Sequence, residues 1–214
     1  TTLSGGAELA CGDTITAITG LPGSETSGAM AVYTRNGTSV LYGNDKDDWN
    51  LVTYSLESGA IAYTNQFAMQ PIVLDTQGLK LLNATQKYGN FQNSLVSQKI
   101  RTFLDASVQN AVASCVVRDK NQYRVFFSDG TAVYMTFKGD QIIGMTTIDL
   151  IDEVTCVSSL EGTSGREEIY FGSDDGFVYQ MDIGTSFDGD PIAWSFALSF
   201  NHFGSPRQLK TFRK

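Results

Sequence analysis

Short apolar runs separated by turn-forming residues follow one another along most of the chain, a pattern typical of β-strands. The clearest series comprises residues 113–117, 123–127, 131–137 and 141–145, with Ser128-Asp129-Gly130 between the second and third runs. Asp-Gly between two apolar runs favours a tight hairpin because glycine adopts the positive φ that such a turn needs. This region therefore predicts four consecutive antiparallel strands.

The same hairpin recurs elsewhere, each time as an apolar run, a turn and a second apolar run. The other copies are residues 28–33 with 39–42 around Asn36-Gly37, 71–74 with 79–82, and 154–157, 168–171 and 177–181 around a turn at 173–176. The residues taken as strand ends before the turns are Tyr42, Leu74, Phe127 and Phe171, at intervals of 32, 53 and 44 residues. Propeller blades repeat at about 40–50 residues, with four strands each.

One four-stranded unit cannot bury both faces of its sheet, so neighbouring units must stack. We therefore predict an all-β, β-propeller-like fold of antiparallel four-stranded blade repeats, an incomplete propeller of four repeats; a long meander in a sandwich is the alternative. Residues 1–198 are predicted to hold the repeats, and residues 199–214 to form a basic C-terminal linker leading out of the last blade. The least strand-like stretch is 83–108, where residues 95–104 fit a short helix or an outer strand plus loop.

Aromatic side chains fit the space between stacked sheets. Those expected there are Tyr123, Phe127, Tyr134, Tyr170 and Tyr179.

Composition narrows the possible functions of the 214-residue chain. Its net charge is −8, and its basic residues gather only near the C-terminus, which disfavours sequence-specific nucleic-acid binding. No run approaches the roughly 18 apolar residues that would span a bilayer, so no membrane partner is expected. The three cysteines form no CxxC pair; Cys115 and Cys156 lie in apolar runs and are predicted to be buried.

Few residues suggest catalysis. His202 is the only histidine, which disfavours a nucleophile–base pair. The carboxylates that would suit glycoside hydrolysis mostly lie in Asp-Gly turns, where bonds to the local backbone are favoured; they are Asp129, Asp174, Asp175, Asp188 and Asp190. Residues 44–48 and 182–190 are oxygen-rich, but neither has the order of a calcium loop. We therefore assign no catalytic, cofactor-binding or metal residue and expect no enzyme.

A resemblance is carried by the C-terminal region. The residues are Phe171-Gly-Ser-Asp-Asp-Gly-Phe-Val-Tyr-Gln-Met-Asp182, then Gly184-Thr-Ser-Phe-Asp-Gly-Asp-Pro-Ile192, then Phe200-Asn-His-Phe-Gly-Ser-Pro-Arg207. This signature resembles bacteriophage virion proteins of the tail and neck that carry a β-propeller, such as packaged-DNA stabilisation proteins and tail nozzle proteins. The likeness covers about the last 45 residues; the earlier repeats agree only in hairpin style.

The resemblance implies a structural virion protein, made in the host cytoplasm, that forms a homo-oligomeric ring, typically a hexamer, with other tail or neck proteins. The ring would retain the genome, conduct it through its channel and take part in DNA ejection, and an acidic wall would let DNA slide. Residues 83–93 and 199–214 are the expected contact segments. Because the chain begins at Thr1 and the relatives are longer, we expect a piece of a larger polypeptide. The alternative is a carbohydrate-binding or carbohydrate-cleaving β-propeller, a receptor-binding module or glycosidase.

Overall fold

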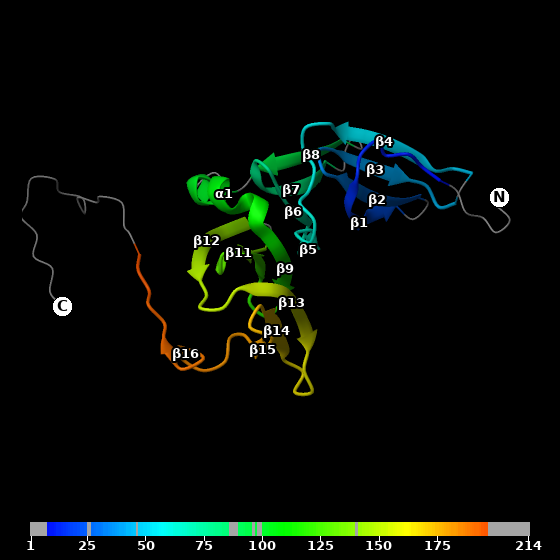
Figure 1. Cartoon of the computed structure of the whole chain (residues 1–214). Coiled ribbons are helices and arrows are strands. Elements are labelled where there is room, and N and C mark those ends of the chain that lie inside the picture. Colours follow the sequence, from blue (N-terminus) through cyan, green and yellow to red (C-terminus); the bar gives the residue numbers. More distant parts are fainter. Residues whose placement is uncertain are drawn as a thin grey trace, which may run out of the picture. The chain divides into compact units, whose positions relative to one another are not determined.

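A computed structural model describes residues 8–24, 27–45, 47–85, 90–95, 97, 100–139 and 141–196. The chain separates into two units, Thr1–Ile183 and Gly184–Lys214. Figure 1 labels the elements along the chain.

The described residues of the first unit form four separate antiparallel sheets, one after another along the sequence. Sheet A consists of β1 (Ile15–Ser24), β2 (Ser27–Thr34), β3 (Thr38–Tyr42) and β4 (Asn50–Ser55). Sheet B consists of β5 (Gln66–Phe67), β6 (Pro71–Asp75), β7 (Gly78–Thr85) and β8 (Asn90–Leu95).

A short helical connection, α1 (Arg101–Ser107) and η2 (Val108–Asn110), leads into the second half of this unit. Sheet C consists of β9 (Ala111–Val117), β10 (Gln122–Phe127), β11 (Thr131–Lys138) and β12 (Gln141–Asp149). Sheet D has three strands among the described residues: β13 (Val154–Glu161), β14 (Glu167–Ser173) and β15 (Val178–Gln180).

The sheets pack face to face in sequence order. Alternate residues of a strand point to opposite faces of its sheet, so one strand can contribute to the apolar clusters on both sides. In β6, Val73 belongs to the apolar cluster shared with sheet A, and Leu74 to the one shared with sheet C. In β10, Val125 faces sheet B and Phe126 faces sheet D. A sandwich has two sheets, whereas the described residues of this unit form four, so the prediction of an all-β fold of stacked, propeller-like antiparallel units is confirmed; three of these sheets have four strands and sheet D has three.

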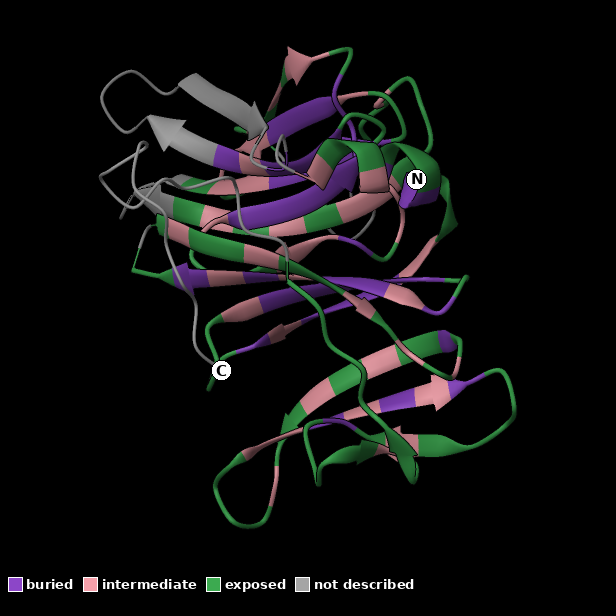
Figure 2. Ribbon diagram, turned by 90° about the vertical axis from the view of Figure 1, so that its left-hand side faces the viewer, coloured by how far each residue is buried: buried purple, intermediate pink, exposed green. Residues whose placement is uncertain are grey.

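Burial is uneven along the stack. Figure 2 shows purple strands through the middle layers and mostly exposed surface on sheet D below them. Tyr123 and Phe127 are fully buried, and Tyr134 and Tyr179 pack against the cluster between sheets C and D, as expected. Tyr170 differs: it lies on the other face of sheet D, and its hydroxyl donates to Glu168.

The hairpin between the second and third strands is the true repeating feature. Its glycines are Gly37, Gly78, Gly130 and Gly176, at intervals of 41, 52 and 46 residues. Tyr42 ends the third strand of sheet A rather than the second, so the first of the predicted strand ends was misaligned. Gly78, Gly130 and Gly176 have positive φ as predicted, but Gly37 does not. At Gly37 the chain turns differently: the Thr34 hydroxyl accepts from the Gly37 amide.

The stretch 83–108 contains more regular structure than expected. It holds the end of β7, the strand β8, and the helix α1, which begins at Arg101 and so continues beyond the expected 95–104. Strand formation was missed because residues 90–95 are mostly polar, which suits an outer strand rather than a buried one. The helix accounts for the longest interval between repeats.

The second unit is small in its described part. Strands β16 (Ser186–Phe187) and β17 (Asp190–Pro191) form a hairpin whose turn residues, Asp188 and Gly189, both have positive φ. That combination defines a type I′ turn. The first unit ends at Ile183, whereas the boundary at 198 stays a prediction, because residues 199–214, expected as a basic linker, lie outside the described residues.

Candidate functional site

The carboxylates that the sequence offered for catalysis bond within their own turns. Asp129 Oδ1 accepts from the Thr131 amide at 3.0 Å and from the Thr131 hydroxyl at 2.6 Å. Asp175 accepts from the Phe177 amide at 2.9 Å and from the Tyr179 hydroxyl at 2.7 Å. The hydrogen bond from the Phe177 amide, which is the largest cause, and the one from the Tyr179 hydroxyl hold the pKa of the Asp175 carboxyl below its ordinary value. Both side chains therefore act as turn anchors, as the turn chemistry predicted.

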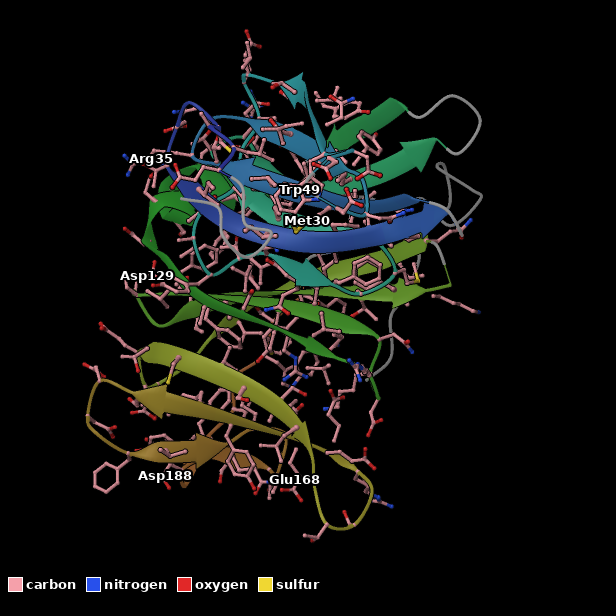
Figure 3. All side chains as sticks on the ribbon, turned by 90° about the vertical axis from the view of Figure 1, so that its right-hand side faces the viewer. Met30, Arg35, Trp49, Asp129, Glu168 and Asp188 are labelled. Atoms are coloured by element: carbon pink, nitrogen blue, oxygen red, sulfur yellow. The ribbon has the colours of Figure 1, made fainter. Side chains whose placement is uncertain are left out.

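Asp129 lies at a turn of sheet C, and Glu168 is the second residue of β14 in sheet D (Figure 3). Asp188 and Asp190 belong to the type I′ hairpin of the second unit.

The acidic loop 44–48 is organised by its own backbone. Asp48 Oδ1 accepts from the amides of Asn44 and Asp45, each at 2.9 Å. Asn44 Oδ1 accepts from the Gly28 amide at 2.8 Å, tying the loop to β2. Within the part of the chain that the structure describes, no three acidic, histidine or cysteine side chains gather as metal ligands would.

The two cysteines of the apolar runs differ in environment. Cys115 is buried as predicted, and that burial raises the pKa of its thiol to about 12, which makes thiolate chemistry unfavourable. Cys156 is exposed, so that prediction was wrong. It pairs with Gly172 on the face of sheet D that points away from sheet C, which no described sheet covers.

A charged cluster joins sheets C and D. Arg124, in the middle of β10, has a side chain only 1% exposed, and its Nη2 lies 2.7 Å from Asp182 Oδ2. Arg124 also donates to Gln122 Oε1 at 2.8 Å, and its guanidinium carbon lies 4.2 Å from the centre of the Tyr134 ring. Lys120 Nζ reaches the same Asp182 oxygen at 2.8 Å. A buried guanidinium is tolerated because these groups satisfy it.

Asp182 is only partly buried in this cluster, because its side chain is 28% exposed. Partial burial acts to raise its pKa, but hydrogen bonds from Arg124 and Lys120 outweigh burial and lower the pKa overall. Asp182 lies next to Ile183, where the first unit ends, so the cluster fixes the last turn of sheet D to sheet C. Sequence reasoning missed it; the available signal was an arginine inside the apolar run 123–127.

A hollow of about 550 Å³ lies along the first strands of sheets B, C and D. Its lining is largely polar and includes Gln66, Ser114, Arg118, Asp119 and Glu167. Asp119 and Glu167 exchange bonds with each other's backbone amides, at 2.9 and 3.2 Å, and Gln66 donates to the Ser114 carbonyl at 2.9 Å. The side chains of Asp119, Glu167 and Gln66 are therefore occupied in joining neighbouring sheets.

The outer edge of sheet D, formed by β15, is unpaired among the described residues. Phe177 and Met181 bond to β14, so the amides of Val178 and Gln180 between them point away from it. No described strand pairs with that side of β15. Phe177, Val178 and Ile183 are 67%, 73% and 63% exposed there. An unpaired edge with apolar side chains is a natural site for strand pairing.

The single histidine, His202, and the expected contact segment 199–214 lie outside the described residues. Of the expected contact segment 83–93, only the backbone of residues 83–85 and 90–93 is described. No helix within the described residues combines the length and apolar character needed to cross a membrane.

The chain matches no model of a known protein family and no curated protein. Among solved structures it is similar to BamB from Moraxella catarrhalis, with a TM-score of 0.44 and 15% identity, over 76% of this chain and 41% of that one. The chain thus spans less than half the length of that structure. The class of protein therefore follows from its own sheets: an all-β chain of stacked, propeller-like antiparallel units.

Proposed function

We propose that this chain is a structural component of a bacteriophage virion, at the tail or neck, and that it works through interfaces between subunits. The observation that carries the proposal is the C-terminal signature, Phe171 to Asp182 and Gly184 to Ile192, which resembles tail nozzle and packaged-DNA stabilisation proteins. Its first part forms the β14–β15 hairpin, and its second part spans the β16–β17 hairpin.

The side-chain chemistry supports an interface role. The candidate carboxylates Asp129 and Asp175 are held by their turns, and the groups lining the hollow join the sheets to one another. By contrast, large apolar side chains are exposed at the edge of sheet D. A surface of that kind suits association with another protein better than catalysis.

The charge is compatible with a wall along which DNA slides. The net charge of −8 repels phosphates, whereas a basic channel would hold the genome in place. In this proposal identical subunits surround the tail axis, typically six, with other tail and neck proteins as neighbours.

Electron microscopy of phage particles labelled with antibodies against the purified chain tests the proposal. We expect label at the neck or tail, around its axis. Label that is absent from particles, together with binding of the chain to an oligosaccharide, would favour the carbohydrate-acting alternative instead. That alternative requires two carboxylates about 5–10 Å apart in one pocket.

A further inference from the structure

The second unit contains a strand-like segment that pairs with nothing in the described structure. From Ile192 the sequence alternates large apolar and small residues, Ile-Ala-Trp-Ser-Phe through Phe196, and the alternation continues in sequence to Phe200. This two-residue period is the signature of a strand with one apolar face. Residues 192–196 have no regular structure, and Ile192, Trp194 and Phe196 are 46%, 79% and 69% exposed.

Among the described residues, sheet D lacks a fourth strand. Sheets A, B and C each have a fourth strand on the outer side of the third, whereas β15 has none among the described residues. The equivalent of Val178 in sheet C is Ala132, which pairs with Ile148 of β12 and is 0% exposed. The equivalent of Gln180 is Tyr134, which pairs with Thr146. Val178 and Gln180 present the same backbone groups to solvent.

We propose that residues 192–196 of one copy of the chain pair with the free edge of β15 in a second copy, as the missing fourth strand of its sheet D. This inference rests on the homo-oligomer in the proposed function and names its contact. Strand addition satisfies the outward amides of Val178 and Gln180, and it covers Trp194 and Phe196 against apolar residues of the edge.

Charge favours the same occupant. Residues 153–183, which hold sheet D, carry seven acidic residues and one basic residue, Arg166. Residues 199–214, which directly follow the strand-like segment, carry four basic residues and no acidic one. The positive charge that follows the strand-like segment is therefore complementary to the negative charge of sheet D, and electrostatic attraction between the two speeds association.

The symmetry of such a contact suits a ring. The donor segment and the acceptor edge are different surfaces of one chain, so each copy donates to the next, and a head-to-tail contact of this kind closes into a ring when the rotation allows. A contact within one chain would satisfy the same groups but would leave the chain monomeric.

Mixed-copy cross-linking tests the proposal. In a background with Cys11→Ser and Cys156→Ser, one preparation carries Gln180→Cys and another carries Ser195→Cys. We expect a disulfide-linked dimer only when the two are mixed under oxidation. A chain carrying both substitutions that closes within itself, with no linked dimers, would overturn the inference in favour of pairing within one copy.

Light scattering across a concentration series supplies the second measurement. The double variant Trp194→Ser, Phe196→Ser is expected to raise the concentration for assembly by more than about tenfold, because buried aromatic anchors dominate interfaces. Ala193→Ser, on the small-residue face of the segment, is the matched control. On the acceptor side, Val178→Pro removes the outward amide, whereas Val178→Thr keeps it.

The outcomes separate this inference from the proposed function. Wild-type chain that stays monomeric at all concentrations, or an oligomer unaffected by these variants, contradicts strand exchange. Label on the particle axis in the microscopy experiment would still support the virion role in that case. Absence of label with intact strand exchange would instead contradict the virion role alone.

Discussion

In sheet C the third strand, β11, lies between β10 and β12, whereas in sheet D the equivalent strand, β15, pairs with β14 alone among the described residues. The faces differ in the same way. Arg124 and Phe126 of sheet C are covered by sheet D, but their equivalents, Tyr170 and Gly172, lie on a face that no described sheet covers. The equivalent hairpins β10–β11 and β14–β15 thus differ in burial, because only β10–β11 has described strands and sheets on every side.

The difference teaches that burial in this fold depends on position in the stack. A strand in a middle sheet loses water on both faces, and its residues are mostly apolar on both. A strand in the last sheet keeps one exposed face, and serine, glycine and cysteine are accepted there. The predictions below test whether sheets C and D carry the unequal stability that this arrangement implies.

The largest difference is expected from aromatic truncation. Phe126 is 0% exposed between sheets C and D, so Phe126→Ala is expected to lower the free energy of unfolding by about 3–5 kcal/mol. Phe177 is 67% exposed at the edge of sheet D, so Phe177→Ala should change it by less than about 0.5 kcal/mol. Urea unfolding of the two variants measures both. Equal losses would contradict the contrast between the sheets.

Removal of Arg124 is expected to have the next largest effect. Arg124→Ala leaves Asp182 without its closest partner and removes the cation over the Tyr134 ring, and we expect a loss of about 3 kcal/mol. Lys120→Ala is the control, because Lys120 is 48% exposed and its pair is worth roughly 0.5 kcal/mol. Chemical denaturation followed by tryptophan fluorescence gives both values, and a larger loss for Lys120→Ala would contradict the account.

Much of the repeating fold was predictable, since its signal is local. The runs around Ser128-Asp129-Gly130 and the turn at 173–176 specify hairpins through strand periodicity and turn glycines, and both hairpins formed where expected. The turn roles of Asp129 and Asp175 followed from the same local chemistry. These features need no knowledge of distant residues.

The predictions that failed depended on contacts between residues far apart in the sequence. Cys156 lies in an apolar run, but its exposure depends on whether another sheet covers that face. The pairing of Arg124 with Asp182 joins residues 58 positions apart, and no local pattern specifies it. Tyr42 was misaligned for a related reason: every strand of a four-stranded sheet ends at a turn, so the turn alone does not tell which strand it follows.

A smaller effect is expected at the turn glycine of sheet D. Gly176 has φ of +87°, and no atom lies near the position of an added Cβ, so Gly176→Ala should cost about 1 kcal/mol through backbone strain alone. Gly144 in β12 has similar space and no positive φ, so Gly144→Ala is expected to be neutral or slightly stabilising. Thermal unfolding compares them, and the reverse order would contradict the assigned turn geometry.

The smallest expected effect is on the loss of folding stability at acidic pH. The hydrogen bonds from Arg124 and Lys120 outweigh partial burial, so the folded-state pKa of Asp182 lies below its unfolded value. Its contribution to stability is therefore present above the unfolded pKa of about 4 and is lost as the pH falls through the folded pKa. Asp182→Asn should destabilise the chain at pH 7 and reduce the loss of stability between pH 5 and pH 2, by about 1 kcal/mol. Unfolding curves at these pH values measure it, and an unchanged acid dependence would contradict the role of Asp182.

Hydrogen exchange of individual backbone amides tests the central contrast between sheets C and D most directly. In the dissociated chain, Ala132 and Tyr134 of β11 are expected to be protected, while Val178 and Gln180 of β15 exchange rapidly. On assembly at higher concentration, Val178 and Gln180 should become protected, with no change at Ala132 and Tyr134. Protection of Val178 and Gln180 in the monomer, or rapid exchange there in the assembled state, would contradict a sheet D that a second copy completes.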